Sequence, residues 1–191
     1  RYVEATVSRV VQVVDGPPSL VLLDVSCGTG RLLECLRRQF PQGTLIGLDG
    51  SWGMIRQANA KTPVRPLSVV QGLADHLTFR NATFDRVVCT NAFHYFHRPL
   101  NVLQECRRVL KPLGAVVLLD WCRESWHCRL IDGWLRLVDR THVRMYTRRE
   151  LHALLAEAGF VTQRSERFRV SWFLGWKIWD MMLVIATPTP S

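Results

Sequence analysis

One short apolar run leads directly into a glycine-rich turn, and this pair limits the fold more than any other feature of the chain. Residues 20–24 are four apolar residues and an acid, and the turn at residues 26–30 holds two glycines. A run this short is typical of a strand buried on both faces. Apolar side chains then recur at helical spacing, at Leu32, Leu33, Leu36 and Phe40. The pattern predicts strand, turn and helix, with backbone N–H groups at the helix N-terminus open to a ligand. Tight packing alone explains the turn equally well.

A second apolar run, at residues 44–48, ends in Asp49, about 20 residues after the first turn. An acid at the tip of a second strand can accept hydrogen bonds from both ribose hydroxyls of a nucleoside cofactor. The turn and the acid together predict a site for such a cofactor.

The loop DVSCGTG, at residues 24–30, resembles the D-x-G-C-G-T-G loop of class I S-adenosylmethionine-dependent methyltransferases, in the small group similar to ubiquinone and menaquinone C-methyltransferases. DGSWGMI, at residues 49–55, is similar to D-x-S-x-x-M-L of that family. GLADHLTF, FDRV and RVLKPLG resemble three more of its motifs, so the resemblance covers residues 3–186. Two positions depart from the family. Ser26 replaces the first glycine, and Leu73 replaces an aspartate that accepts a hydrogen bond from the adenine amino group.

The resemblance implies an α/β fold with a doubly wound, seven-stranded, mostly parallel sheet of the Rossmann-like methyltransferase type, whose last strand is antiparallel. It implies a single domain over residues 1–191. It also implies a cytoplasmic enzyme that moves the methyl group of S-adenosyl-L-methionine to carbon or oxygen of a small apolar or aromatic acceptor, with or without an acidic group. The cofactor-binding residues that the family motifs indicate are Asp24, Ser26, Cys27, Gly28, Gly30, Asp49, Gly50, Met54, Leu73, Ala74 and Asn91.

The loop at residues 91–99 follows a predicted strand at residues 84–90. Open α/β sheets bind ligands beyond the carboxyl ends of their strands, so we expect this loop to face the transferred methyl group. His94 is the first candidate for a general base, because the resembled family often has histidine here. His142 and Tyr146 are second candidates. A structural hydrogen-bonding role is the alternative for each of the three.

Seven tryptophans favour a flat or apolar acceptor. Aromatic faces also stabilise cations such as a sulfonium, by ~0.5–2 kcal/mol each. Candidates for the walls of the acceptor site are Phe93, Trp121, Trp126, Trp134, Trp172 and Trp176. Core packing explains such residues as well. Arg144 is a candidate for holding an acceptor carboxylate or phosphate, with a surface role as the alternative.

Basic residues outnumber acidic ones by 25 to 16, and the net charge of +9 favours anionic partners. Nucleic acid, an anionic membrane surface and an acidic substrate all fit, as does a solvated surface without a partner. No helix-turn-helix, zinc-finger or RNP motif is present, so we expect no sequence-specific nucleic-acid binding. No apolar stretch approaches the ~20 residues of a membrane-spanning helix, so any membrane contact is expected to be weak contact with an anionic surface. The main expected partner is a small-molecule acceptor. The oligomeric state is left open.

The six cysteines form no C-x-x-C pair, and several lie in apolar runs. Free, buried thiols of a cytosolic protein explain them better than disulfides. Their spacing also predicts no metal site.

Apolar periodicity predicts helices at residues 2–14 and 52–61 and one through Ile131 and Val138. The second of these has Ser51 as its cap, with Met54 among its inward residues. The predicted remaining strands are residues 67–70, 115–121, 160–171 and 178–187, with a turn at 111–114. Thr147 and Glu150 form a capping box that opens a further helix.

Two other functions remain open from the sequence. A nicotinamide-dependent reductase uses the same turn and acid, but Ser26, Gly28 and Arg31 stand where its G-x-G-x-x-G would be. A non-catalytic module that keeps the fold for interaction is favoured by Ser26 and Leu73. The absence of an N/D-P-P-Y motif after residue 90 argues against amino methylation of a nucleobase.

Overall fold

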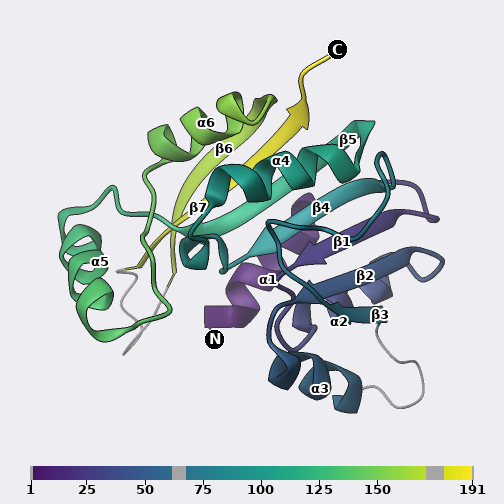
Figure 1. The fold of residues 1–191 in the computed structure, drawn as a ribbon, viewed down its shortest axis with the longest axis horizontal. Helices are drawn as coiled ribbons and strands as arrows, with labels where there is room; N and C mark the ends of the chain where they lie inside the picture. Colours follow the sequence, from purple (N-terminus) through teal and green to yellow (C-terminus); the bar gives the residue numbers. More distant parts are fainter. Residues whose placement is uncertain (1, 62–67, 171–178, 191) are drawn as a thin grey trace.

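The computed structural model describes residues 2–61, 68–170 and 179–190. Within them, a seven-stranded sheet has the order β3-β2-β1-β4-β5-β7-β6 (Figure 1). The first five strands run parallel to one another: β1 (Val21–Val25), β2 (Thr44–Asp49), β3 (Ser68–Gln71), β4 (Phe84–Thr90) and β5 (Leu110–Trp121). The strand order reverses between β1 and β4, which is the place where open α/β sheets bind ligands.

The other edge of the sheet is antiparallel. β7 (Trp179–Pro188) pairs antiparallel with β5 and with β6 (Phe160–Val170). The predicted doubly wound, mostly parallel sheet with an antiparallel last strand is therefore confirmed.

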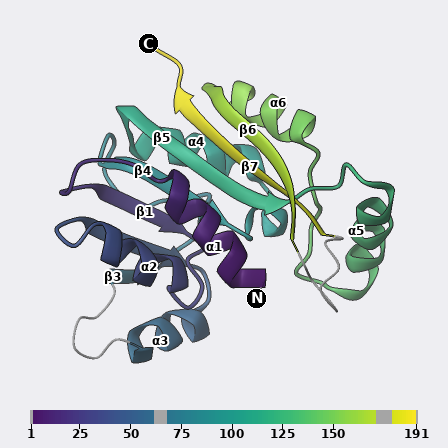
Figure 2. The same cartoon turned by 180° about the vertical axis from the view of Figure 1, so that it is seen from behind.

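Helices cover both faces of the sheet. One face carries α1 (Tyr2–Val13) and α2 (Arg31–Gln39), which lie in front of the sheet in Figure 2 and share its hydrophobic cluster. The other face carries α4 (Pro99–Val109) and α6 (Arg148–Glu157). Three further helical segments follow strands: α3 (Trp52–Lys61), the short η1 (Phe93–Tyr95) and α5 (Trp126–Val138).

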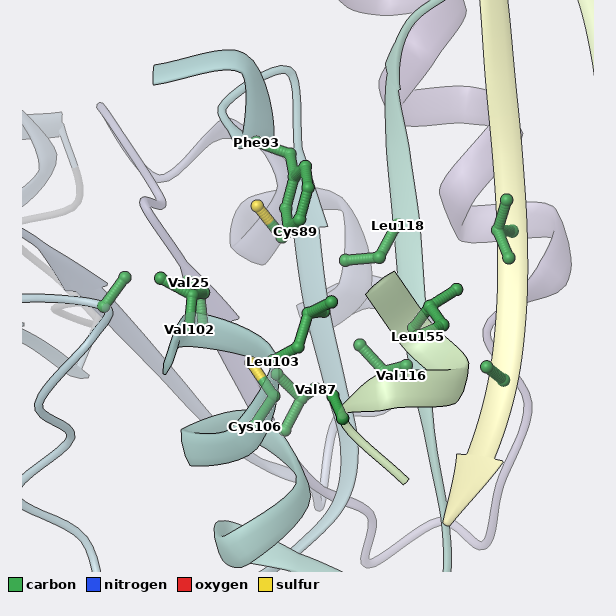
Figure 3. Close-up of a cluster of buried hydrophobic side chains, with 14 of the residues drawn as sticks. Val25, Val87, Cys89, Phe93, Val102, Leu103, Cys106, Val116, Leu118 and Leu155 are labelled. Atoms are coloured by element: carbon green, nitrogen blue, oxygen red, sulfur yellow. The ribbon is translucent and has the colours of Figure 1, made fainter. Parts of the chain in front are cut away.

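The core under α4 and α6 consists of buried apolar side chains. Figure 3 shows Val87 of β4 and Leu118 of β5 meeting Leu103 of α4 and Leu155 of α6, and all four are buried. Burying a leucine or valine side chain contributes about 1.5–3 kcal/mol. This packing holds the carboxyl ends of the central strands in one rigid edge.

Most predicted elements are present within a residue or two. The prediction of a turn at residues 111–114 before the strand is wrong. These residues belong to β5, where they form an irregularity in its pairing with β4. They stand opposite Asp85, between the pairs Leu110–Phe84 and Ala115–Arg86. Pro112 has no N–H to offer a ladder, and Lys111 Nζ instead binds Asp85 Oδ1 at 2.8 Å. The chain therefore bulges without leaving the strand.

Met54 also differs from its expected inward position, because its side chain is exposed at the start of α3. Residue 67 of the third predicted strand and residues 171 and 178 of the last two lie outside the described residues. So do the predicted acceptor-site residues Trp172 and Trp176.

Candidate functional site

A cavity of about 550 Å³ opens at the carboxyl ends of β1, β2 and β4. This volume lies in the range of small-molecule sites. An adjoining cavity of about 280 Å³ shares Ser26 and Tyr95 with it. Seven of the predicted cofactor residues line the larger cavity: Asp24, Ser26, Cys27, Gly28, Asp49, Met54 and Asn91. Gly50, Leu73 and Ala74 line the smaller one, and Gly30 lines neither.

The turn after β1 has a left-handed backbone at three positions. The φ angles are 59° at Ser26, 54° at Gly28 and 75° at Gly30, which is the N-cap of α2. Glycine adopts this conformation freely, whereas a residue with a Cβ does so at a cost of roughly 1–2 kcal/mol. Ser26 thus holds a backbone conformation that favours glycine, at the expense of local strain.

Gly30 contributes to the site through the backbone. Its left-handed conformation turns the chain from the loop into α2, and Glu34 N donates to its carbonyl oxygen at 3.0 Å. A β-carbon added at Gly28 would meet nothing within 4 Å. Open space therefore adjoins the Gly28 backbone, and a ligand can approach it closely.

Asp49 ties this turn to the tip of β2. Its Oδ2 accepts from Gly28 N at 2.8 Å, and its Oδ1 accepts from Ser51 N at 2.8 Å. Cys27 N also donates to Leu48 O at 3.0 Å. The carboxylate is therefore fixed between two loops at the cavity wall, where it has further lone pairs to offer to a ligand.

The Asp24 carboxyl lies at the base of the cavity. Burial, with the negative charge of Asp49 nearby, raises the pKa of Asp24 well above its ordinary value. Burial likewise raises the pKa of the Cys27 thiol, helped by the charges of Asp24 and Asp49. A cation placed in this cavity would favour the ionised form of Asp24, because opposite charge stabilises a carboxylate.

Leu73 presents an exposed apolar side chain to the smaller cavity. It cannot accept a hydrogen bond, so the structure offers no side-chain acceptor at this position. Asp75 lines the same cavity and is the nearest acid along the chain.

Asn91 connects the cavity to α1. Its backbone has a φ of 55°, and its Oδ1 accepts from the hydroxyl of Tyr2 at 2.6 Å. Its Nδ2 donates to Thr6 Oγ1 at 2.9 Å, and Trp121 Nε1 donates to the Tyr2 hydroxyl. Sequence reasoning missed Tyr2, since no local pattern links residues 89 positions apart. It also missed Tyr95 and Thr141, both of which line the cavity.

His94 lies behind the cavity wall and is fully buried. Its Nδ1 is 2.6 Å from Asp120 Oδ1, and its backbone N–H donates to Asp120 Oδ2 at 2.8 Å. The imidazole stacks on Trp121 with 4.0 Å between ring centroids. The other ring nitrogen, Nε2, has no hydrogen-bond partner among the described residues. Asp120 is another residue that sequence reasoning missed.

His142 and Tyr146 lie close to His94, and none of the three lines either cavity. The His142 ring centroid is 5.5 Å from that of His94, and its Nε2 is 2.9 Å from Asp132 Oδ1. Tyr146 packs edge-on against Phe93 at 5.3 Å, in the core. The role of all three candidate bases stays a prediction.

The other predicted acceptor-site residues have different surroundings. Phe93 is buried in the core, whereas Trp126 and Trp134 are exposed on α5 and line neither cavity. Arg144 binds Glu150 Oε1 and lies over the Tyr146 ring. Its guanidinium is therefore already paired.

The cysteines of the chain are free thiols. Among the described residues, His127, Cys128 and Asp180 bring possible metal-ligating atoms within 4.8 Å of one another. Asp180 already accepts from Ser125 and from Arg169 Nε. An arginine beside the carboxylate opposes the approach of a cation.

A family model described as a methyltransferase domain matches residues 23–118. The chain is 34% identical over 149 residues to a malonyl-[acyl-carrier protein] O-methyltransferase of Geobacter sulfurreducens, covering 73% of this chain and 55% of that protein. It is 33% identical over 112 residues to a demethylmenaquinone methyltransferase of Thermotoga maritima, covering 59% and 48%. The chain thus spans about half the length of these curated relatives.

Among solved structures, a SAM-dependent methyltransferase from Thermotoga maritima superposes with a TM-score of 0.79 at 21% identity, covering 100% of this chain and 90% of that one. At this identity the likeness shows a shared fold. The family match begins inside β1 and ends inside β5, so it contains the glycine turn, Asp49 and the loop with His94. This chain belongs to the methyltransferase domain family.

Proposed function

We propose that residues 1–191 form a single cytoplasmic domain that binds S-adenosyl-L-methionine and transfers its methyl group to carbon or oxygen of a small apolar or aromatic acceptor. The observation that carries the proposal is the joining of Asp49 to the glycine turn at the cavity wall. The two relatives named above act, by their names, on malonyl-[acyl-carrier protein] and demethylmenaquinone. Both names fit an acceptor that reacts at oxygen or carbon.

The cavity residues suit the three parts of this cofactor. Asp49 would accept from the ribose hydroxyls, and the open backbone at Gly28 would approach the amino-acid part. Asp24 would face its positive charge. Gly50, Leu73 and Ala74 would surround the adenine in the smaller cavity, with packing in place of the hydrogen bond that Leu73 lacks. Bound S-adenosylmethionine supplies a methyl group on a sulfonium, which is an activated leaving group.

The chain then has to position the acceptor and, where the acceptor holds a proton, remove it. Orientation of two bound reactants can contribute about 7–11 kcal/mol. We assign the removal of this acceptor proton to His94 Nε2. Asp120 accepts from Nδ1–H, which fixes the tautomer in which Nε2 is a base. The Trp121 ring holds the imidazole from one face.

Calorimetric titration of the purified chain with S-adenosylmethionine, and separately with NADH, tests the cofactor. We expect binding of the first and none of the second. Asp49→Ala should abolish binding, because it removes the acceptor and frees the turn. The matched control is Asp15→Ala, whose exposed carboxylate pairs with Arg86 outside the cavity. Equal affinity in wild type and Asp49→Ala would contradict the proposed site. Binding without turnover on any acceptor would favour the interaction module.

Transfer of a labelled methyl group to a demethylated quinol and to a malonyl thioester tests the base. We expect His94→Ala and Asp120→Asn to lower kcat by about 10²–10⁴ with little change in cofactor affinity. His142→Ala is the comparison, because its ring is anchored to Asp132 in a similar way. Loss of activity in His142→Ala alone would move the base to that residue. Melting curves of each variant separate lost catalysis from lost folding.

A further inference from the structure

Helix α5 turns an apolar stripe towards solvent. Five exposed side chains repeat at intervals of one to four residues along the helix: Trp126, Leu130, Trp134, Leu137 and Val138. We call these five residues the α5 stripe. Leu137 is 86% exposed, and Trp126 is 74% exposed. Residues spaced three or four apart share one face of a helix, so the stripe is continuous. In both Figure 1 and Figure 2, α5 stands at one end of the molecule, apart from the sheet.

The opposite face of α5 is anchored to the protein. Cys128 and Asp132 are buried, and Ile131 and Leu135 pack against the hydrophobic cluster under α1 and α2. Asp132 also accepts from Met145 N at 2.6 Å. The helix is therefore fixed in orientation, and the α5 stripe is its outer surface. A contiguous apolar patch on an otherwise polar surface marks an interaction site.

The charges beside the stripe are mostly positive. Residues 122–149 include seven arginines and only three acids, Glu124, Asp132 and Asp139. Asp132 is paired with Arg136, and Glu124 with Arg148 and Arg167. Arg129 and Arg140 have no carboxylate partner among the described residues, and both are exposed. Arg129 lies within α5, and Arg140 lies just beyond its end. The partner of this surface should therefore be both apolar and negatively charged.

We infer that α5 binds the surface of an anionic lipid bilayer, with the α5 stripe entering the headgroup region and the neighbouring arginines meeting lipid phosphates. A helix with tryptophan and leucine on one face and basic residues beside them binds membranes in the interfacial plane. At 13 residues α5 lies on the bilayer and does not cross it. None of the helices in the described part of the chain is long and apolar enough to span a membrane.

A bilayer fits this surface better than a protein groove does. The stripe is the outer, convex face of a single helix, and a bilayer surface accepts such a face along its whole length without shape complementarity. Tryptophan side chains prefer the membrane interface, where the ring is buried and the N–H remains wet. Thr141, close after α5, lines the larger cavity. Docking through α5 therefore brings the cavity near the bilayer, in which an apolar acceptor would dissolve.

Co-sedimentation of the full chain with vesicles tests the inference. We expect binding to vesicles of phosphatidylcholine mixed with phosphatidylglycerol, weak binding to pure phosphatidylcholine, and release by added salt. Trp134→Ser should weaken binding by roughly ten-fold or more, because it removes a large apolar surface that the bilayer would bury. Arg129→Gln should weaken it about five-fold.

The matched control is Leu113→Ser. Leu113 is 94% exposed, but it lies near the start of β5, at the opposite end of that strand from the segment that leads into α5, among residues that line a different cavity. Its variant should bind vesicles as wild type does. Melting temperatures should be unchanged in all three variants, because the substituted side chains are exposed. Equal binding to both vesicle types, equal loss in Leu113→Ser and Trp134→Ser, or a stripe-dependent dimer on gel filtration would each overturn the inference.

Discussion

At the end of β1, the carboxyl group of Asp24 is buried beside Asp49, and its raised pKa has a consequence for stability. Above the ordinary aspartate pKa of 3.8, the unfolded chain has released the proton that the folded chain still holds. Folding then requires proton uptake, so this residue lowers stability progressively as the pH rises towards the raised pKa. The site thus retains an acid that is unfavourable for folding, as binding sites often do.

Replacing this acid should separate folding from binding. We expect Asp24→Asn to raise the melting temperature at neutral pH and to leave it nearly unchanged well below pH 3.8, where the folded and the unfolded wild type both hold the proton. The same variant should bind S-adenosylmethionine more weakly, since it cannot ionise to face a cation. Asp15→Asn is the control. Arg86 lowers the pKa of Asp15, so this substitution should give no gain at neutral pH. A lower melting temperature for Asp24→Asn at neutral pH would contradict the argument.

Among the elements, α6 shows how a short sequence signal decides a helix start. Thr147 Oγ1 accepts from Glu150 N at 3.2 Å, and Glu150 Oε2 accepts from Thr147 N at 2.8 Å. Burial opposes the charge of Glu150, but hydrogen bonds from Thr147 and Arg123 outweigh it and lower the pKa of Glu150 to about 2. This contribution to stability is present above pH 4.5 and is lost as the pH falls towards 2.

Thr147→Ala should therefore lower the free energy of unfolding by about 1 kcal/mol, because one N-terminal amide of α6 loses its acceptor. Thr147→Ser keeps the hydroxyl and should remain within a few tenths of a kcal/mol of wild type. Urea denaturation followed by circular dichroism measures both. An equal loss in the two variants would assign the effect to the threonine methyl group and not to the cap.

Over the whole molecule, the cavity joins residues from the two halves of the sheet and from α1. A ligand bound there contacts β1, β2 and β4 at once, so its binding energy adds to global stability. S-adenosylmethionine at about 100 times its Kd should stabilise the chain by roughly 2.7 kcal/mol, which corresponds to a rise of about 5–10 °C in Tm. Thermal melts with and without the cofactor measure this. A shift of the same size in Asp49→Ala would show that the ligand binds elsewhere.

The sequence by itself determined the strands, the helices, and the turn and acid that line the larger cavity. These signals are local: apolar runs, helical spacing, the glycine turn and Asp49 lie within a single βα unit and the strand after it. Sheet order followed from the family resemblance. The left-handed backbone of Ser26 also agrees with the family resemblance, because the resembled motif has a glycine at this place in the turn.

Only the tertiary structure decided which distant groups meet. The pairing of His94 with Asp120 and that of Tyr2 with Asn91 depend on which strand ends adjoin, and periodicity carries no information about that. It also decided that Trp126 and Trp134 face solvent. Helix α5 has apolar residues on both faces, so its pattern alone cannot say which face is buried. The body of the protein covers Ile131 and Leu135 and leaves the α5 stripe outside.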